Sequence, residues 1–225
     1  NNSTRTGFDL ALNFNKKVQD VDINLGVNAM YYTNENTKVD ELYEDQYRYR
    51  KGTPTDGIWG LQTDGFYTSE EEILNSGITS SYNGELKPGD LKFADLDKSG
   101  TVDNGQNTLD DHGDLKVIGN TTPRYQFGLN LSANWNGIGI SAFFQGVGKR
   151  NWYPHRESAF FWGQYDRPYS YMLKEHTGNN VWTEENQNTD AYWPRYRGYL
   201  ANGSTKALGI QANDRYLQNI AYVRL

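Results

Sequence analysis

The feature that most constrains this chain is a strict alternation of apolar and polar side chains near its start. Residues 7–15, GFDLALNFN, carry an apolar side chain at every second position, and residues 21–32, VDINLGVNAMYY, repeat this pattern after a short link. Successive side chains of a β-strand point to opposite faces, so a period of two predicts strands with one apolar and one polar face. The two segments are therefore expected to form an antiparallel hairpin.

A second hairpin is predicted near the middle of the chain. Residues 125–135 alternate in the same way, and residues 138–147 follow with a similar pattern. Asn136 and Gly137 lie between them, and this dipeptide is the strongest short-range signal for a two-residue hairpin turn. The predicted fold class is therefore all-β, with antiparallel strands.

The connections between these strands are of two very different lengths. The turns inside the hairpins have about two to five residues, whereas the connections after Tyr32 and after Val147 run for roughly 65 to 90 residues, far beyond usual loop lengths. Barrels of the outer membrane alternate short periplasmic turns with long extracellular loops, so the pattern favours part of a large transmembrane β-barrel. The expected strands are about 7–15, 20–33, 124–135, 138–147 and 216–225, and the expected extracellular loops are about 34–120 and 148–215.

The same alternation also suits a soluble β-sandwich, in which the apolar face of one sheet packs on that of another. The alternative to a membrane transporter is therefore a soluble extracellular β-domain that binds calcium and adheres to glycans. The two hypotheses differ in what covers the apolar face, which is lipid in a barrel and a second sheet in a sandwich. A barrel fragment is expected to need detergent or the rest of its chain.

Composition excludes several classes of protein. Aromatic residues make up 14% of the 225 residues, which is far too many for a disordered chain. There is no cysteine, so neither a disulfide framework nor a thiolate metal site can form. The net charge of -6 without a run of lysine and arginine argues against a nucleic-acid partner. No apolar run is long enough for a transmembrane helix, although barrel strands need no such run.

Residues 93–106, FADLDKSGTVDNGQ, have the ligand spacing of a calcium-binding loop. Such a loop presents oxygen ligands at its first, third, fifth, seventh and ninth positions, with a glycine for the sharp turn at the sixth. Gly100 takes the sixth position. The predicted calcium ligands are the side chains of Asp95, Asp97, Ser99 and Asp103 and the main-chain carbonyl of Thr101.

The loop departs from this pattern at its twelfth position, where Gln106 replaces the expected bidentate glutamate. The alternative to a metal site is a turn rich in aspartate, serine and glycine, because these residues favour turns by themselves. If calcium binds, its expected role is structural, because a long loop has no core of its own to hold its backbone.

The second long connection is rich in aromatic residues interleaved with arginines. Flat apolar rings with polar tips suit sugars, peptides or the surface of a partner protein. The alternative is that most of these rings pack the connection against itself. The predicted cargo contacts are Trp152, Tyr153, Trp162 and Tyr165.

Catalysis is not expected. His112, His155 and His176 are scattered, without a carboxylate or nucleophile at a useful spacing. No phosphate-binding glycine loop and no HExxH metal helix is present in the sequence. Runs of adjacent glutamates are typical of a solvated surface rather than of an acid and base pair.

Five ordered motifs give the chain a family resemblance. Together they resemble the C-terminal barrel region of the SusC/RagA family of TonB-dependent outer-membrane transporters, and they cover most of the chain. The motifs are GIWGLQTDGFY at 57–67, KPGDLKFADLDKSGTVD at 87–103, VIGNTTPRYQFG at 117–128, AYWPR at 191–195 and DRYLQNIAYVRL at 214–225.

The resemblance implies that the chain is roughly a quarter of a longer protein, whose plug domain and first strands lie upstream and whose barrel closes with about 22 strands. It implies nutrient import across the bacterial outer membrane, with a glycan or a peptide as cargo, a SusD-like surface lipoprotein as partner and TonB as the energy source. It also implies Asp114 as the acid that completes the metal ligands, with Asp110 and Asp111 as alternatives, and a structural role for Arg195.

Overall fold

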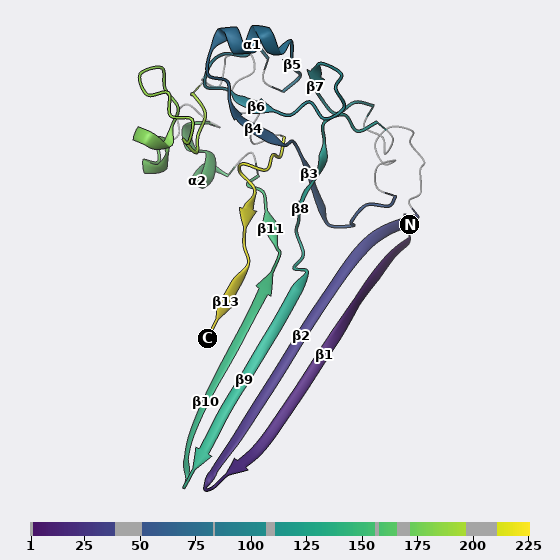
Figure 1. Ribbon diagram of the computed structural model, residues 1–225, viewed down its shortest axis with the longest axis vertical. Helices are drawn as coiled ribbons and strands as arrows, with labels where there is room; N and C mark the ends of the chain where they lie inside the picture. Colours follow the sequence, from purple (N-terminus) through teal and green to yellow (C-terminus); the bar gives the residue numbers. More distant parts are fainter. Residues whose placement is uncertain are drawn as a thin grey trace.

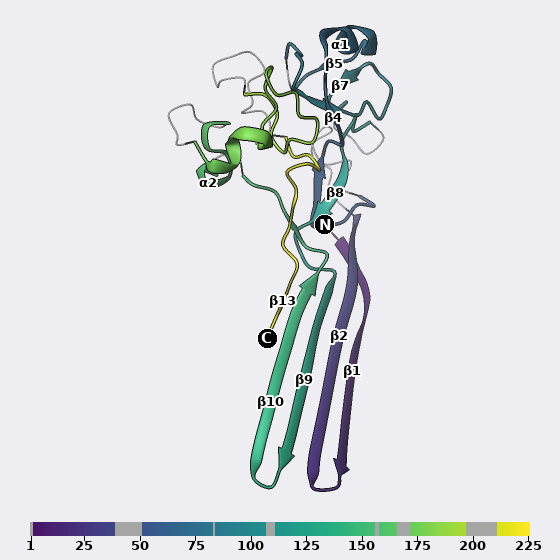
Figure 2. The ribbon, with the colours of Figure 1, turned by 60° about the vertical axis from the view of Figure 1, so that its left-hand side comes forward.

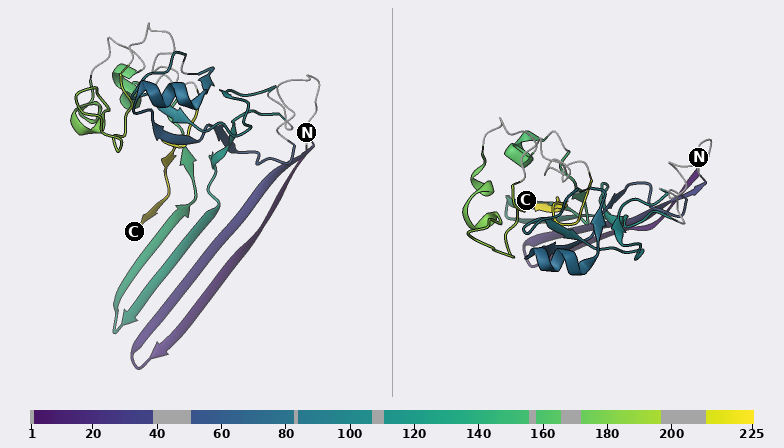
Figure 3. Two further views of the ribbon diagram at one scale, coloured as in Figure 1. Left: turned by 45° about the horizontal axis from the view of Figure 1, so that its top comes forward. Right: turned by 90° about the horizontal axis from the view of Figure 1, so that it is seen from above.

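The computed structural model describes residues 2–38, 51–82, 84–106, 111–155, 158–165, 172–196 and 211–225. These residues form a long antiparallel sheet and a head of short elements at one end of it (Figure 1). The hairpin turns lie at the opposite end of the sheet, and seen from above the head elements gather over the strand ends (Figure 3). No helix within the described ranges is both long and apolar enough to cross a membrane.

The long sheet has five strands in the order β1-β2-β9-β10-β13, all paired antiparallel. The two strands of the first hairpin are longer than the alternation predicted. The turn between them therefore contains only Gln19 and Asp20. The second turns through Asn136 and Gly137, whose φ angles of 45° and 85° are typical of the turn type that matches strand twist. The strands are β1 (Asn2–Val18), β2 (Val21–Lys38), β9 (Tyr125–Trp135), β10 (Ile138–Gly148) and β13 (Tyr222–Arg224).

The pairing register gives this sheet one apolar and one polar face. Leu25 pairs with Leu131 in the next strand, which continues an apolar row across the sheet. One residue away, Asn24 pairs with Ser132 and donates a side-chain hydrogen bond of 3.1 Å to its hydroxyl. A shift of one residue would move every apolar side chain to the polar face, so the alternation itself fixes the register.

Neither face of the sheet is covered by a second layer of described residues (Figure 2). On the apolar face, Phe8 is 61% exposed and Ile140 is 73% exposed. The remaining described sheets have two strands each and lie in the head. The described residues therefore form neither the sandwich of the soluble alternative nor a closed barrel, and β1 and β13 are the edges of an open sheet.

The head corrects the expectation of two long loops and of one final strand. The stretch 34–120 begins with the end of β2 and then forms short paired strands, and the stretch 148–215 contains further short elements. The expected final strand 216–225 is split: Tyr216 is fully buried in the head, residues 218–219 pair with residues 151–152, and residues 222–224 pair with β10. The head comprises β3 (Gly57–Gly60), β4 (Thr63–Phe66), α1 (Glu70–Ser76), β5 (Thr79–Ser80), β6 (Leu91–Phe93), β7 (Thr101–Val102), β8 (Lys116–Asn120), β11 (Asn151–Trp152), α2 (Ala159–Trp162), the 3-10 turns Gly163–Tyr165, Lys174–His176 and Gly178–Asn180, and β12 (Gln218–Asn219).

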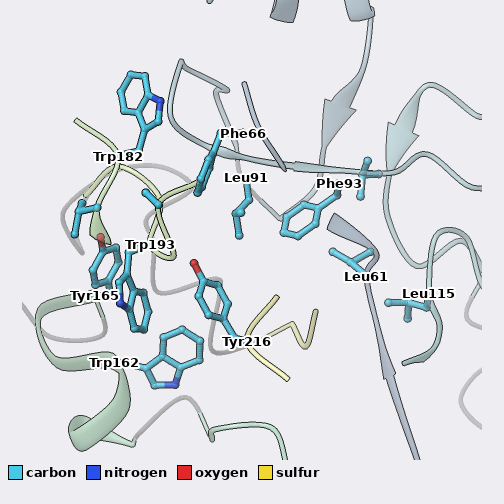
Figure 4. Packing of buried hydrophobic residues seen from close by; sticks show 13 residues of the cluster. Leu61, Phe66, Leu91, Phe93, Leu115, Trp162, Tyr165, Trp182, Trp193 and Tyr216 are labelled. Atoms are coloured by element: carbon cyan, nitrogen blue, oxygen red, sulfur yellow. The ribbon is translucent and has the colours of Figure 1, made fainter. Parts of the chain in front are cut away.

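The buried core of the described residues lies in the head (Figure 4). Trp193 stacks on Tyr216 with ring centroids 5.0 Å apart, and Trp162 packs edge-on against both. Leu61 and Phe66, from the first long connection, are buried in the same cluster. Because each buried aromatic ring removes a large apolar area from water, the two long connections fold as one packed body.

Candidate functional site

The predicted calcium loop lies between β6 and β7 in the head. Phe93 and Val102, at its two ends, are buried in the core with 5% and 1% exposure. The loop turns at Lys98 and Gly100, which have φ angles of 62° and 83°. A Cβ at Gly100 would meet no atom within 4 Å, so this position needs glycine for its backbone angle and not for space.

Three carboxylates meet at this loop. One oxygen from each of Asp95, Asp97 and Asp114 lies within 4.8 Å of the others. Calcium binds oxygens at 2.3–2.6 Å, so two oxygens on opposite sides of one ion are separated by about 5 Å, whereas the shorter bonds of magnesium reduce this to about 4 Å. The three oxygens lie close enough together to be shared by one calcium ion.

Asp114 connects the beginning and the end of the loop. Its carboxylate accepts hydrogen bonds from the backbone N–H groups of Leu96 and of Asp103, the latter at 2.9 Å. The side chain is fully buried, and burial together with the charge of Asp97 raises the pKa of Asp114 above its ordinary value. Of its two rivals, Asp111 lies beside Gly105 outside the carboxylate group, and Asp110 falls outside the described residues.

The remaining predicted ligands, Ser99, Thr101 and Asp103, form hydrogen bonds to other groups of the loop. Ser99 donates its hydroxyl to the carbonyl of Thr101 at 3.0 Å, and Asp103 accepts from the N–H of Gly105 at 2.7 Å. Asp97 accepts from the N–H of Ser99 at 2.8 Å, a bond that lowers the pKa of Asp97. The structure thus brings together Asp95, Asp97 and Asp114 from the predicted ligands. These three carboxylates also accept backbone hydrogen bonds, those of Asp95 coming from the N–H groups of Ser99 at 3.1 Å and Gly100 at 2.9 Å.

Charge is the second reason to regard this loop as a candidate metal site. In the described part of the chain, no lysine or arginine forms an ion pair with Asp95, Asp97 or Asp114. Close carboxylates repel one another, and this repulsion opposes their ionisation. A hard divalent cation would offset that repulsion with ligands that calcium prefers.

The four predicted cargo contacts divide into two pairs. Trp152 is 44% exposed in β11, and Tyr153 is half-buried with its hydroxyl 3.0 Å from the side-chain nitrogen of Asn213. Trp162 and Tyr165 are each only 1% exposed, and Tyr165 donates its hydroxyl to the carbonyl of Pro194 at 2.7 Å. These two rings belong to the core and do not offer a surface to cargo.

An ion pair between two distant segments joins parts of the head, and the apolar alternation could not predict it. Arg195 donates from Nε to Asp90 at 2.8 Å and from its terminal nitrogen at 3.2 Å. Asp90 is 3% exposed, so this two-armed contact joins the second long connection to the first. The contact agrees with a structural role for Arg195. The sequence offered one indication of this contact, because Asp90 and Arg195 both lie in the motifs that carry the family resemblance.

Comparison with known proteins supports the fold. No protein-family model and no curated protein sequence matches the chain. By structure, the chain is similar to a chain in the structure of the RagAB peptide importer in the "open-open" state, with a TM-score of 0.58 and 18% sequence identity. The match covers 99% of this chain and 21% of that chain. The chain thus has the fold of part of an importer chain, and it spans about a fifth of that chain's length.

Proposed function

We propose that this chain is part of an outer-membrane importer of the SusC/RagA type, which takes up glycans or peptides. The observation that carries the proposal is the long sheet, whose apolar face lies open along its whole length and whose fold is similar to that of part of a peptide importer. Strands of outer-membrane barrels need such a face toward lipid and a polar face toward the lumen.

The apolar face is too large to be an ordinary solvent-exposed surface. Soluble monomers rarely expose contiguous apolar patches beyond a few hundred Å². The pairing register places the exposed side chains of four strands side by side on this one face. They are Phe8, Leu10, Leu12, Phe14, Val18, Ile23, Phe127, Leu131, Trp135, Ile138 and Ile140.

In a barrel of this kind, the two ends of the sheet lie on opposite sides of the membrane. The short turns at Gln19 and Asn136 face the periplasm, and the head lies at the cell surface, where it contacts cargo and a SusD-like lipoprotein. TonB supplies the energy through a part of the protein upstream of this chain. These assignments rest on the family resemblance and on the short and long connections of outer-membrane barrels.

In this proposal calcium has a structural role. Bound by Asp95, Asp97 and Asp114, it would hold the loop between β6 and β7 in one conformation, with Ser99, Thr101 and Asp103 as the further oxygen ligands of the set. The closeness of the three carboxylate oxygens, all within 4.8 Å of one another, supports this role. No catalytic role is proposed for the chain.

Uptake by cells tests the import function. The full-length protein, expressed in an outer membrane that lacks other importers for the probes, is expected to take up labelled tripeptides or oligosaccharides. Uptake should stop in a strain without TonB, which serves as the control for passive leakage. Equal uptake with and without the protein would contradict the proposal. A full-length protein that stays monomeric in water without detergent would instead favour the soluble alternative.

A further inference from the structure

A pocket of about 430 Å³ opens in the head beside the aromatic core. Cavities of this size accommodate small ligands or single large side chains. Phe160, Phe161, Tyr192 and Trp193 supply aromatic walls. These residues belong to the aromatic-rich second connection expected to contact cargo, but they are not among the four predicted contacts.

The walls of this pocket are held in place from behind. Phe161 packs on Trp193 with ring centroids 5.4 Å apart, and Tyr192 packs on Trp193 at 5.2 Å. Trp193 itself is 3% exposed and stacks on the fully buried Tyr216. Phe160, by contrast, is 86% exposed. A large ring left in water beside rigid aromatic walls is a favourable contact for an apolar group.

Among the described residues that line this pocket, the polar side chains carry a single charge. His176 is 3% exposed, and its Nε2 lies 3.2 Å from the carbonyl of Phe161, which makes Nε2 the protonated nitrogen. Burial lowers the pKa of His176, so the ring is neutral at physiological pH. Glu175 is therefore the one charged side chain among the described residues that line the pocket, and its exposed carboxylate suits a cation.

An oriented amide completes the pocket. The side-chain nitrogen of Gln218 donates to the hydroxyl of Tyr192 at 3.1 Å and to the carbonyl of Tyr216 at 2.8 Å. These two bonds fix the carboxamide, so its oxygen faces away from both partners. A fixed carbonyl oxygen is an acceptor for a ligand N–H group.

We propose that this pocket binds the N-terminal residue of a short peptide whose first side chain is aromatic. The ring packs against Phe160 and the walls, the α-ammonium pairs with Glu175, and Gln218 accepts a hydrogen bond from the peptide backbone. A neutral sugar could also stack on these aromatic walls, but it carries no cation to pair with Glu175. The inference rests on the proposed import function and names the cargo class for one site.

Binding to the purified full-length protein in detergent, measured by titration calorimetry, tests this inference. The probes are Phe-Ala-Ala, its N-acetylated form, Ala-Ala-Ala and maltotriose. The unmodified tripeptide should bind about tenfold or more tightly than each of the other three. Binding of maltotriose in preference to Phe-Ala-Ala, or no binding of Phe-Ala-Ala, would overturn the inference.

Two variants separate the ring contact from the charge contact. Phe160→Ala should weaken binding of Phe-Ala-Ala about tenfold, and its exposed position makes the change harmless to folding. Glu175→Gln should weaken Phe-Ala-Ala to the level of the acetylated peptide and leave the acetylated peptide unchanged. Leu74→Ala, an exposed side chain on α1 outside this pocket, is the control and should change neither value.

The outcomes distinguish this inference from the import function itself. If uptake depends on the protein but both variants bind Phe-Ala-Ala like the wild type, the pocket assignment is wrong and the importer proposal stands. If the variants lose binding as expected but cells take up no probe, the pocket assignment stands and the importer proposal is wrong.

Discussion

Arg124 and Asp56 form a two-armed ion pair where the long sheet joins the head. The terminal nitrogens of Arg124 lie 2.8 Å and 2.7 Å from the two carboxylate oxygens of Asp56. The side chains are 7% and 8% exposed, and the backbone N–H of Thr122 adds a third bond to Asp56 at 3.1 Å. Arg124 directly precedes β9 and Asp56 directly precedes β3, so the pair fixes the start of one strand against the start of the other.

Asp56→Asn is expected to destabilise this junction by about 3–5 kcal/mol, because it leaves the buried guanidinium of Arg124 without its charge partner. Hydrogen exchange of the full-length protein should show faster exchange at residues 120–125. The matched control is Asp64→Asn, because Asp64 is 74% exposed and 3.7 Å from Lys92. Such a surface pair contributes less than about 1 kcal/mol, and an equal effect of both changes would contradict the role of the pair.

The same junction should resist acid. Burial alone would raise the pKa of Asp56, but the hydrogen bonds from Arg124 and Thr122 outweigh it and hold this pKa well below the ordinary value of 3.8. A depressed pKa contributes stability that is present above 3.8 and is lost as the pH falls through the folded-state pKa. The difference in exchange between wild type and Asp56→Asn should therefore stay constant down to about pH 4 and shrink below it. A difference that disappears between pH 7 and pH 5 would contradict this assignment.

The two faces of the sheet should respond differently to charge. If the apolar face meets lipid, Leu129→Arg in the middle of β9 should cost about 2–4 kcal/mol, and Ile140→Arg, nearer the turn, should cost less. Asn130→Arg, on the polar face of the same strand, is the matched control and should be mild. Urea titration of the full-length protein folded into lipid vesicles measures these changes. Equal penalties at Leu129 and Asn130 would contradict a lipid-facing assignment.

Calcium removal should loosen the loop between β6 and β7 while the long sheet stays formed. Without the ion, the carboxylates of Asp95, Asp97 and Asp114 repel one another, whereas the sheet is held by its own hydrogen-bond ladder. Limited proteolysis of the full-length protein should show faster cleavage within residues 90–115 when a chelator is added. Magnesium should restore protection poorly, because it requires a tighter octahedron.

Variants of the acidic residues provide the control for this experiment. Asp95→Ala should reproduce the loss of protection in the presence of calcium. Asp111→Ala, which changes an acid outside the carboxylate group, should retain protection. If cleavage is the same with calcium, with chelator and in Asp95→Ala, the loop is a turn without a metal.

Local pattern by itself determined the architecture of the long sheet. The alternation around Leu12 and Leu131 specified strands with two unlike faces, and Asn136 with Gly137 specified a tight turn. These properties follow from the backbone geometry of a few neighbouring residues, so they can be read without knowing the rest of the fold. The ligand spacing from Asp95 to Asp103 is local in the same sense.

Only the tertiary structure decided how distant residues combine. Trp162 and Tyr165 are residue types common in binding surfaces. They are buried here because Trp193 and Tyr216, from elsewhere in the chain, pack on them. Asp114 could not be chosen over Asp111 by spacing, because a contact across the loop depends on how the intervening segment folds back. Burial and long-range contacts depend on how the whole chain packs. Periodicity depends only on residues that are neighbours in the sequence.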